Sequence, residues 1–132
     1  MENIGNGFKI NDIEFEGQKY SVDKVVELGL SRLYQNQQSD GGFSYYSSYY
    51  AYSDLYLTLR VANTLKLLKD AGYSVSSDSI KNVVGFINTQ IVNNINVYNN
   101  KDLLILGAYT LSPMSEYGGM SQQVVSRVKA LE

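Results

Sequence analysis

The side chains with which this chain could do chemistry are carboxylates, amides and phenols, because the sequence contains no cysteine and no histidine. Those two absences exclude zinc sites of the usual Cys/His kind, disulfides, thiol nucleophiles and Ser-His or Cys-His dyads. A calcium site built from Asp and Glu would need neither residue type, but the sequence shows no EF-hand spacing. We therefore expect no metal site, no cofactor and no catalytic cysteine or histidine.

Carboxylates could still act as a general acid and base. A glycosidase on an α/α barrel, for example, needs two carboxylates that face each other across a cleft. Asp40, Asp54 and Asp102 all lie at predicted helix ends, where turn formation and N-capping already explain them. An α/α-toroid enzyme, cyclase- or glycosidase-like, is therefore an alternative that we do not favour.

A tyrosine-rich segment, residues 44–52, is the other candidate site. It holds five tyrosines and no charged residue. Tyrosine rings can stack on a sugar or a peptide, so a binding module is a second alternative, with a surface formed by Tyr45, Tyr46, Tyr49 and Tyr50. We favour a loop that covers the end of the helices, with ring faces packed and hydroxyls in water, because no charged or amide cluster accompanies the rings.

Directly before this segment, a glutamine-rich helix end runs into Asp40-Gly41-Gly42-Phe43. Glycine adopts a positive φ at little steric cost, and an aspartate can bond to its own backbone two residues on. Phe43 can then fold back as the hydrophobic contact beyond a helix C-terminus. The segment predicts a structural turn formed by Asp40, Gly41, Gly42 and Phe43. Taken alone, these residues fit an ordinary Asp-Gly turn between two helices equally well, so they do not yet indicate a particular fold.

Caps and apolar periodicity predict an all-α chain of about five helices over residues 21–132. The expected N-terminal caps are Ser21, Ser53-Asp54, Ser76 to Asp78 and Ser121, and a further helix runs from Lys101 to about Leu111. The asparagine-rich run from Asn93 to Asn100 predicts a polar loop. Residues 1–20 form an irregular lead-in, in which alternation over residues 8–17 and a turn candidate at Asn11-Asp12 hint at a small β-hairpin.

The predicted helices alternate in character along the chain. The first, third and fifth are amphipathic, whereas the second and fourth are apolar all round, which is typical of buried helices. A simple bundle would give every helix a similar single stripe. Alternation instead indicates two concentric layers, the arrangement of an α/α toroid, of which about five helices make only a part. We therefore expect that faces of the second and fourth helices lack their native neighbours, so that the fragment self-associates or exposes an apolar edge.

Composition excludes several classes of partner. The net charge is −2 and no basic run is present, so we expect no nucleic-acid binding. No apolar segment approaches the roughly 20 residues of a membrane-spanning helix, so we expect no direct membrane insertion.

The closing Leu131-Glu132 matches the scar commonly left ahead of an affinity tag. We therefore expect a fragment of a longer parent protein.

Three segments together resemble a known family. They are Leu30 to Phe43, which ends in Asp-Gly-Gly-Phe, then Ser53 to Thr58, then Leu65 to Ser74, which contains Lys-Asp-Ala-Gly-Tyr. This chain resembles the thioester-containing domain of bacterial α2-macroglobulins over residues 22–92, and more loosely over residues 100–131. The resemblance implies a toroid of the terpenoid cyclase and prenyltransferase type.

In that family the domain presents a Cys-Gln thioester that covalently traps an attacking protease, so the parent acts as an endopeptidase inhibitor. The Cys-x-Glu-Gln motif lies upstream of the Asp-Gly-Gly turn, and nothing in this chain matches it. The resemblance thus implies a non-enzymatic scaffold segment and no reactive residue. It also implies an extracytoplasmic parent, at the cell surface or in the periplasm, whose partners are proteases and its own other domains.

Overall fold

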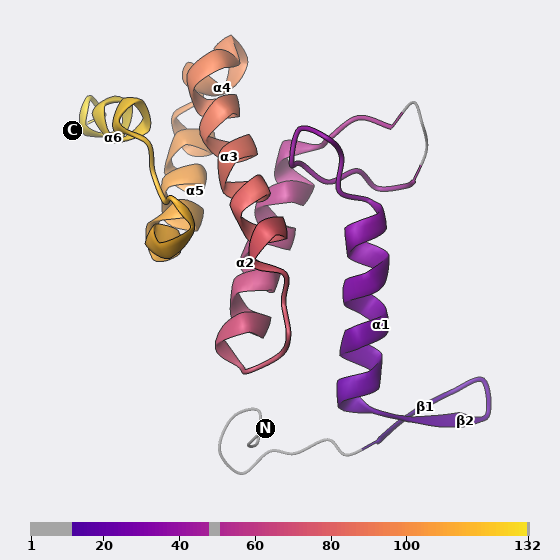
Figure 1. Ribbon diagram of the computed structural model, residues 1–132. Coiled ribbons are helices and arrows are strands. Elements are labelled where there is room, and N and C mark those ends of the chain that lie inside the picture. Colours follow the sequence, from indigo (N-terminus) through magenta and orange to yellow (C-terminus); the bar gives the residue numbers. More distant parts are fainter. Residues whose placement is uncertain (1–11, 48–50, 132) are drawn as a thin grey trace.

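The computed structural model describes residues 12–47 and 51–131, and most of them are helical (Figure 1). The all-α expectation is confirmed at this level. The helices are α1 (Val22–Gln35), α2 (Leu55–Asp70), α3 (Ser77–Asn93), α4 (Ile95–Tyr98), α5 (Lys101–Leu111) and α6 (Gln122–Lys129), with a 3-10 helix, η1 (Ser112–Tyr117), after α5. Two short strands, β1 (Asp12–Phe15) and β2 (Gln18–Ser21), precede α1.

The two strands pair antiparallel, with Asp12 opposite Ser21 and Phe15 opposite Gln18. The turn that joins them is Glu16-Gly17, where φ is 51° and 77°. Two successive positive φ values are what a tight hairpin turn needs to match the twist of its strands. Asn11-Asp12 was therefore the wrong position for the turn: Asp12 belongs to β1, and Asn11 lies outside the described residues.

The helices begin where their caps predict. In each case a side-chain oxygen of the cap accepts a hydrogen bond from a backbone N–H in the first turn, which satisfies a donor that the helix leaves unpaired. The pairs are Ser21 with Lys24 N, Asp54 with Leu57 N, Ser76 with Ser79 N and Ser121 with Val124 N, at 2.8 to 3.3 Å. Local capping chemistry therefore set these boundaries.

Two helical segments differ from expectation. Residues 95–98, expected as part of a polar loop, form α4, whose Val97 is buried in the core. The chain also continues past Leu111 as η1, with Pro113 in its first turn and the fully buried Met114 behind it. In both places one apolar side chain enters the core and turns a polar or proline-marked segment into helix, an effect of packing that local signals do not carry.

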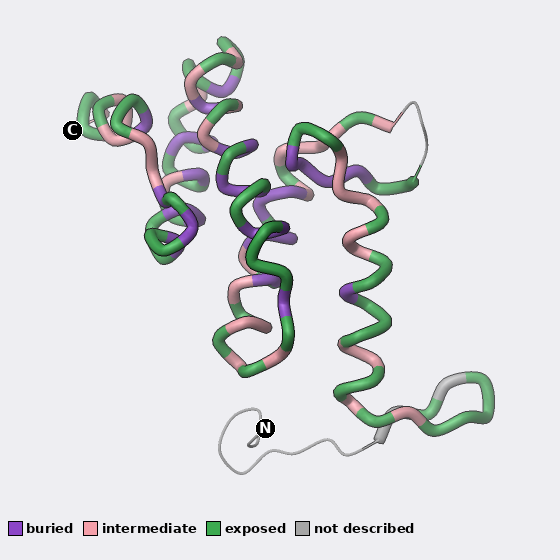
Figure 2. The backbone as a smooth tube through the Cα atoms, viewed as in Figure 1, coloured by how far each residue is buried: buried purple, intermediate pink, exposed green. Residues whose placement is uncertain are grey.

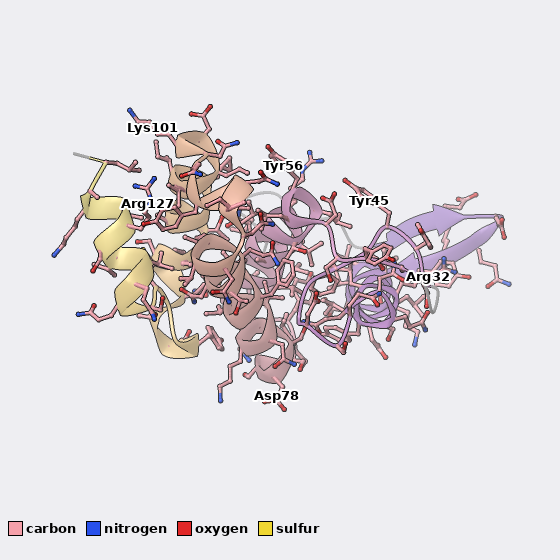
Figure 3. All side chains as sticks on the ribbon, turned by 90° about the horizontal axis from the view of Figure 1, so that it is seen from above. Arg32, Tyr45, Tyr56, Asp78, Lys101 and Arg127 are labelled. Carbon is pink, nitrogen blue, oxygen red and sulfur yellow. The ribbon has the colours of Figure 1, made fainter. Side chains whose placement is uncertain are left out.

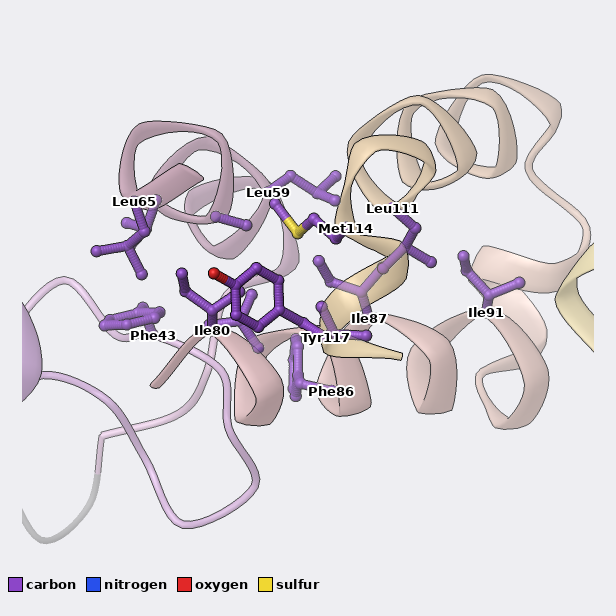
Figure 4. Packing of buried hydrophobic residues seen from close by; sticks show 14 of the residues in the cluster. Phe43, Leu59, Leu65, Ile80, Phe86, Ile87, Ile91, Leu111, Met114 and Tyr117 are labelled. Carbon is purple, nitrogen blue, oxygen red and sulfur yellow. The ribbon is translucent and has the colours of Figure 1, made fainter. Parts of the chain in front are cut away.

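α3 is the centre of the packing. It contacts α2, α4, α5, η1 and α6. Its buried side chains lie along its length and include Ile80, Val83, Ile87 and Ile91. Figure 4 shows this cluster running from Phe43 at one end to Ile91 at the other. A single apolar core therefore holds α2 through α6 together.

α2 and α5 contact each other as well as α3. We expected these two helices to be enclosed, and that expectation is wrong for one side of each. Large apolar side chains remain exposed there: Tyr56 and Leu67 on α2, and Ile105, Leu106 and Tyr109 on α5. Seen from above, Tyr56 points away from the side on which Asp78 of α3 lies (Figure 3). Both helices therefore carry the exposed apolar side chains that the expected apolar edge requires.

α1 is the least enclosed of the long helices. Its single buried residue is Leu30, and Figure 2 shows the rest of the helix half-buried or exposed. Val26, Leu33 and Tyr34 pack only partly against the core. α1 is held instead at its C-terminal end, where the chain enters the predicted turn.

Candidate functional site

The four predicted turn residues form a tight loop closed by hydrogen bonds. Gly41 N donates to Gln38 O at 2.9 Å, and Gln38 N donates to Gly42 O at 2.8 Å. One oxygen of Asp40, Oδ1, accepts from Gly42 N at 3.0 Å and from the Ser53 hydroxyl at 2.6 Å. The aspartate thus folds the turn and ties it to the residues that precede α2, the structural role predicted for Asp40.

Phe43 joins the turn to the first turn of α2. Its side chain is buried, its N–H donates to the Thr58 hydroxyl at 2.9 Å, and its carbonyl accepts from Asp54 N at 2.8 Å. The Thr58 hydroxyl in turn donates to Asp54 O at 2.6 Å. The N–H and the carbonyl of buried Phe43 therefore both have hydrogen-bond partners, as buried backbone groups need because no water reaches them.

Gln37 connects the same turn to α3, and sequence reasoning missed it. Its Nε2 donates to Ser79 O and to Gly41 O, both at 3.0 Å, and its Oε1 accepts from the Ser79 hydroxyl at 2.8 Å. A half-buried amide whose oxygen and nitrogen are both hydrogen-bonded fixes geometry as well as adding stability. The sequence shows the glutamine but not its role, because its partner Ser79 lies 42 residues away.

Close packing leaves no room for side chains at the two glycines. A Cβ at Gly41 would collide with the Asn82 carbonyl of α3, and Gly41 has a φ of 92°. A Cβ at Gly42 would come within 2.9 Å of the Phe86 ring and closer still to Ser53. The Asp40–Phe43 turn is therefore the junction of α1, α2 and α3. Its carboxylate oxygen Oδ1 and the Ser53 and Thr58 hydroxyls already make hydrogen bonds within it.

The tyrosine-rich segment does not pack as we expected. Tyr45, Tyr46 and Tyr52 are 68%, 60% and 86% exposed, so the preferred interpretation of packed ring faces is wrong for these three. Tyr49 and Tyr50 lie outside the described residues. Tyr45 borders a small cavity of about 110 Å³ beside Phe43. The exposed rings keep the binding-module alternative in place for Tyr45 and Tyr46.

A larger cavity, which we call the α1 groove, separates α1 from the turn between α2 and α3. Its volume is about 560 Å³, and its lining includes Asp23, Val26, Glu27, Leu30, Tyr34 and Tyr73. The Tyr34 hydroxyl accepts a hydrogen bond from Ser76 N at 3.0 Å. The groove therefore combines two carboxylates, two aromatic rings and an apolar floor.

Tyr73 has the most perturbed environment in this groove. Its hydroxyl is buried and makes no hydrogen bond to any group in the described part of the chain. Burial of the hydroxyl, and then the nearby Asp23 carboxylate, raise the pKa of Tyr73 above the ordinary value of tyrosine. Both effects disfavour the phenolate, so Tyr73 is a neutral phenol at physiological pH.

A second cavity, of about 570 Å³, lies on the exposed apolar side of α2 and α5. Leu67 and Tyr109 line it, together with Lys66 and Asp70, whose side chains pair at 2.7 Å. The hydrogen bond that Lys66 donates to Asp70 raises the pKa of Lys66. We call this surface, around Leu67 and Tyr109, the α2–α5 face. Most of its lining is apolar and its Lys66–Asp70 pair is already formed, which suits a packing surface.

A third cavity, of about 470 Å³, lies between α6 and the end of α3. The Arg127 guanidinium stacks over the Tyr98 ring at 4.4 Å and donates to Tyr98 O at 2.8 and 3.2 Å. Those bonds satisfy the C-terminal carbonyl of α4. Arg127 therefore has a structural role that explains its position.

Comparison of the chain with known protein families, with curated proteins and with solved structures gave no match. Among residues 12–47 and 51–131, no group of three or more acidic side chains is placed to hold a metal ion. Within the same residues no helix has the length and hydropathy needed to span a bilayer. The function must therefore be argued from the geometry itself.

Gly41→Ala tests the junction. We expect it to lower the free energy of unfolding by about 2–4 kcal/mol, because the new methyl group meets the Asn82 carbonyl at a positive φ. Gly85→Ala is the matched control: Gly85 lies on an exposed face of α3 with no atom near its Cβ position, so alanine should stabilise the protein by about 0.5–1 kcal/mol. Urea unfolding measures both. Equal stability of the two variants would contradict the packing described.

Tyr73→Phe should leave stability at pH 7 unchanged or raise it by up to about 1 kcal/mol, because it removes a buried hydroxyl without a partner. Tyr34→Phe, which removes the acceptor of Ser76 N, should cost about 1 kcal/mol.

Folding raises the pKa of Tyr73, so the folded state favours the neutral phenol more than the unfolded chain does. The stability that this gives is fully present below about pH 10, the ordinary pKa of tyrosine, and is lost as pH rises through the folded-state pKa. Unfolding in urea between pH 7 and 11 should therefore show a smaller alkaline loss of stability for Tyr73→Phe than for the unmodified chain. Parallel curves would contradict this assignment.

Proposed function

We propose that this chain is a scaffold segment of an α/α toroid, the thioester domain of a bacterial α2-macroglobulin-like protease inhibitor. In this proposal the segment does no chemistry and is not an enzyme. The observation that carries it is the α2–α5 face: α2 and α5, the two helices that alternate with the amphipathic ones, contact each other and expose Leu67 and Tyr109 around one cavity.

The arrangement of the helices supports two layers. α2 and α5 touch each other, and α3 packs against both from one side. α6 contacts α3 and α5. In a toroid, the inner helices pack against further inner helices across the interior. An apolar patch with Leu67 69% and Tyr109 75% exposed fits a surface that such neighbours cover.

The junction at Asp40–Phe43 supports the same proposal. It links α1, assigned to the outer layer, with α2, assigned to the inner layer, and docks both on the start of α3. Its groups bond to one another, as a scaffold turn requires. The resemblance in sequence is specific across this junction, and the comparisons neither add to it nor oppose it.

A thioester motif would need such a scaffold because an acyl thioester hydrolyses unless water is kept away from it. The motif would lie upstream of this chain, in the parent, and the nucleophile would come from the trapped protease. The residues described here would fix the shape of the domain around it. The parent would be extracytoplasmic, with proteases and its own other domains as partners.

The parent protein provides the direct test. We expect its reading frame to encode Cys-x-Glu-Gln upstream of Gln37, and the intact parent to take up methylamine and release one thiol. The amine nitrogen attacks the thioester carbonyl and the C–S bond breaks, which leaves an amide and a free cysteine. Mass spectrometry and thiol titration measure the two products. A parent with the motif cysteine changed to alanine is the control, and a reading frame without the motif would refute the proposal.

The α2–α5 face gives a second test on the chain itself. We expect light scattering to show self-association and an apolar dye to bind, because exposed patches of this kind associate. The double variant Leu67→Gln with Tyr109→Gln should reduce both signals, since glutamine keeps the helices but removes the apolar surface. Leu28→Gln, at an exposed leucine on α1, is the matched control and should change neither. A strictly monomeric chain that binds no dye would contradict the prediction.

A further inference from the structure

We propose that the α1 groove binds an organic cation, the guanidinium or ammonium group of an arginine or lysine side chain on a partner protein. The groove is formed by α1 and the turn between α2 and α3, apart from the α2–α5 face. The inference therefore does not rest on the proposed scaffold function, and each can fail without the other.

Charge is the first reason. Asp23 and Glu27 are one helical turn apart on α1 and line the same groove. Asp23 has no ion pair with any described residue, and Glu27 meets only Lys24 at 3.7 Å with both side chains largely exposed. Exposed ion pairs of that kind contribute little free energy, so Glu27 remains able to attract another cation. Two carboxylates in one groove therefore attract a cation and repel an anion.

No basic side chain of the described residues lines the groove, so none there cancels this charge. Lys69, in the last turn of α2, directs its ammonium group to Val75 O at 3.2 Å and towards the Ser77 hydroxyl at 3.5 Å. Gly72, which lines the groove, follows the C-terminus of α2, where the helix dipole is negative. The C-terminal end of α2 thus adds to the negative potential of the two carboxylates.

The aromatic and apolar lining selects an organic cation over a hydrated metal ion. Val26 and Leu30 can cover the alkyl stem of a basic side chain, as stems of Lys and Arg commonly pack on apolar surface. The rings of Tyr34 and Tyr73 stand beside them. The Tyr73 hydroxyl is buried, whereas the side chain as a whole is half-buried and lines the groove. Ring faces attract guanidinium and ammonium groups.

Size agrees with this assignment. The volume of about 560 Å³ falls in the range typical of ligand pockets, roughly 300–1,000 Å³. One extended basic side chain with its backbone fits within it. A side chain from a partner protein adds affinity through the surfaces around it, whereas a single cation alone binds weakly.

The test is an NMR titration of the ¹⁵N-labelled chain with the capped peptide Gly-Arg-Gly and with the same peptide carrying neutral citrulline. We expect shift changes confined to Asp23–Ser31 and Gly72–Ser74, with a dissociation constant on the order of 1 mM that weakens as salt rises. The double variant Asp23→Asn with Glu27→Gln should weaken binding about tenfold or more.

Asp102→Asn is the matched control, because Asp102 is the second residue of α5 as Asp23 is of α1, and loses the same helix-dipole interaction. It should bind like the unmodified chain. Citrulline binding as tight as arginine, or arginine binding unchanged in the double variant, would overturn the proposal. Agmatine, a free guanidinium amine, completes the design: weaker binding than the peptide supports a protein partner, and tighter binding overturns that part.

Discussion

Crowding at residues 41 and 42 is the constraint on which the rest of the arrangement depends. The Asn82 carbonyl, Ser53 and the Phe86 ring approach the backbone there so closely that only glycine fits. This approach brings the end of α1, the start of α2 and the start of α3 to one point. The hydrogen bonds from Gln37 to Ser79 and from Phe43 to Thr58 then fix the three helices in orientation. A short sequence thus sets the geometry of more than half of the described chain.

A second junction lies nearer the other end of α3. Asn88 donates to Val84 O at 2.9 Å and to Gly119 O at 2.8 Å, and accepts from Ser121 N at 2.8 Å. One amide therefore holds the segment that leads into α6. Polar junctions at both ends of α3 leave its middle free for apolar packing against α2 and α5. The same packing uses one side of each of those helices and leaves the other side for a further layer.

Much of this could be predicted from sequence because capping is local. Ser21, Asp54, Ser76 and Ser121 set helix starts through bonds to residues three positions on, so their signals lie within one turn. Val97 and Met114 made helix where the local sequence predicted a loop or a stop, since their burial depends on distant partners. The apolar composition of α2 and α5 did not say which side is covered. The α1 groove was missed because Asp23 and Tyr73 are far apart in sequence, and Gln37 was missed for the same reason.

The weak enclosure of α1 has a consequence for how the molecule unfolds. With Leu30 as its single buried residue, α1 draws little free energy from the core and depends on the bonds at its C-terminal end. Regions with few buried contacts open at lower free energy than the core they adjoin. We therefore expect the hairpin and α1 to open at lower free energy than α2 through α6. Opening separates Asp23 and Glu27 from Tyr73. A ligand bound between them would therefore stabilise the closed state and raise the free energy of opening.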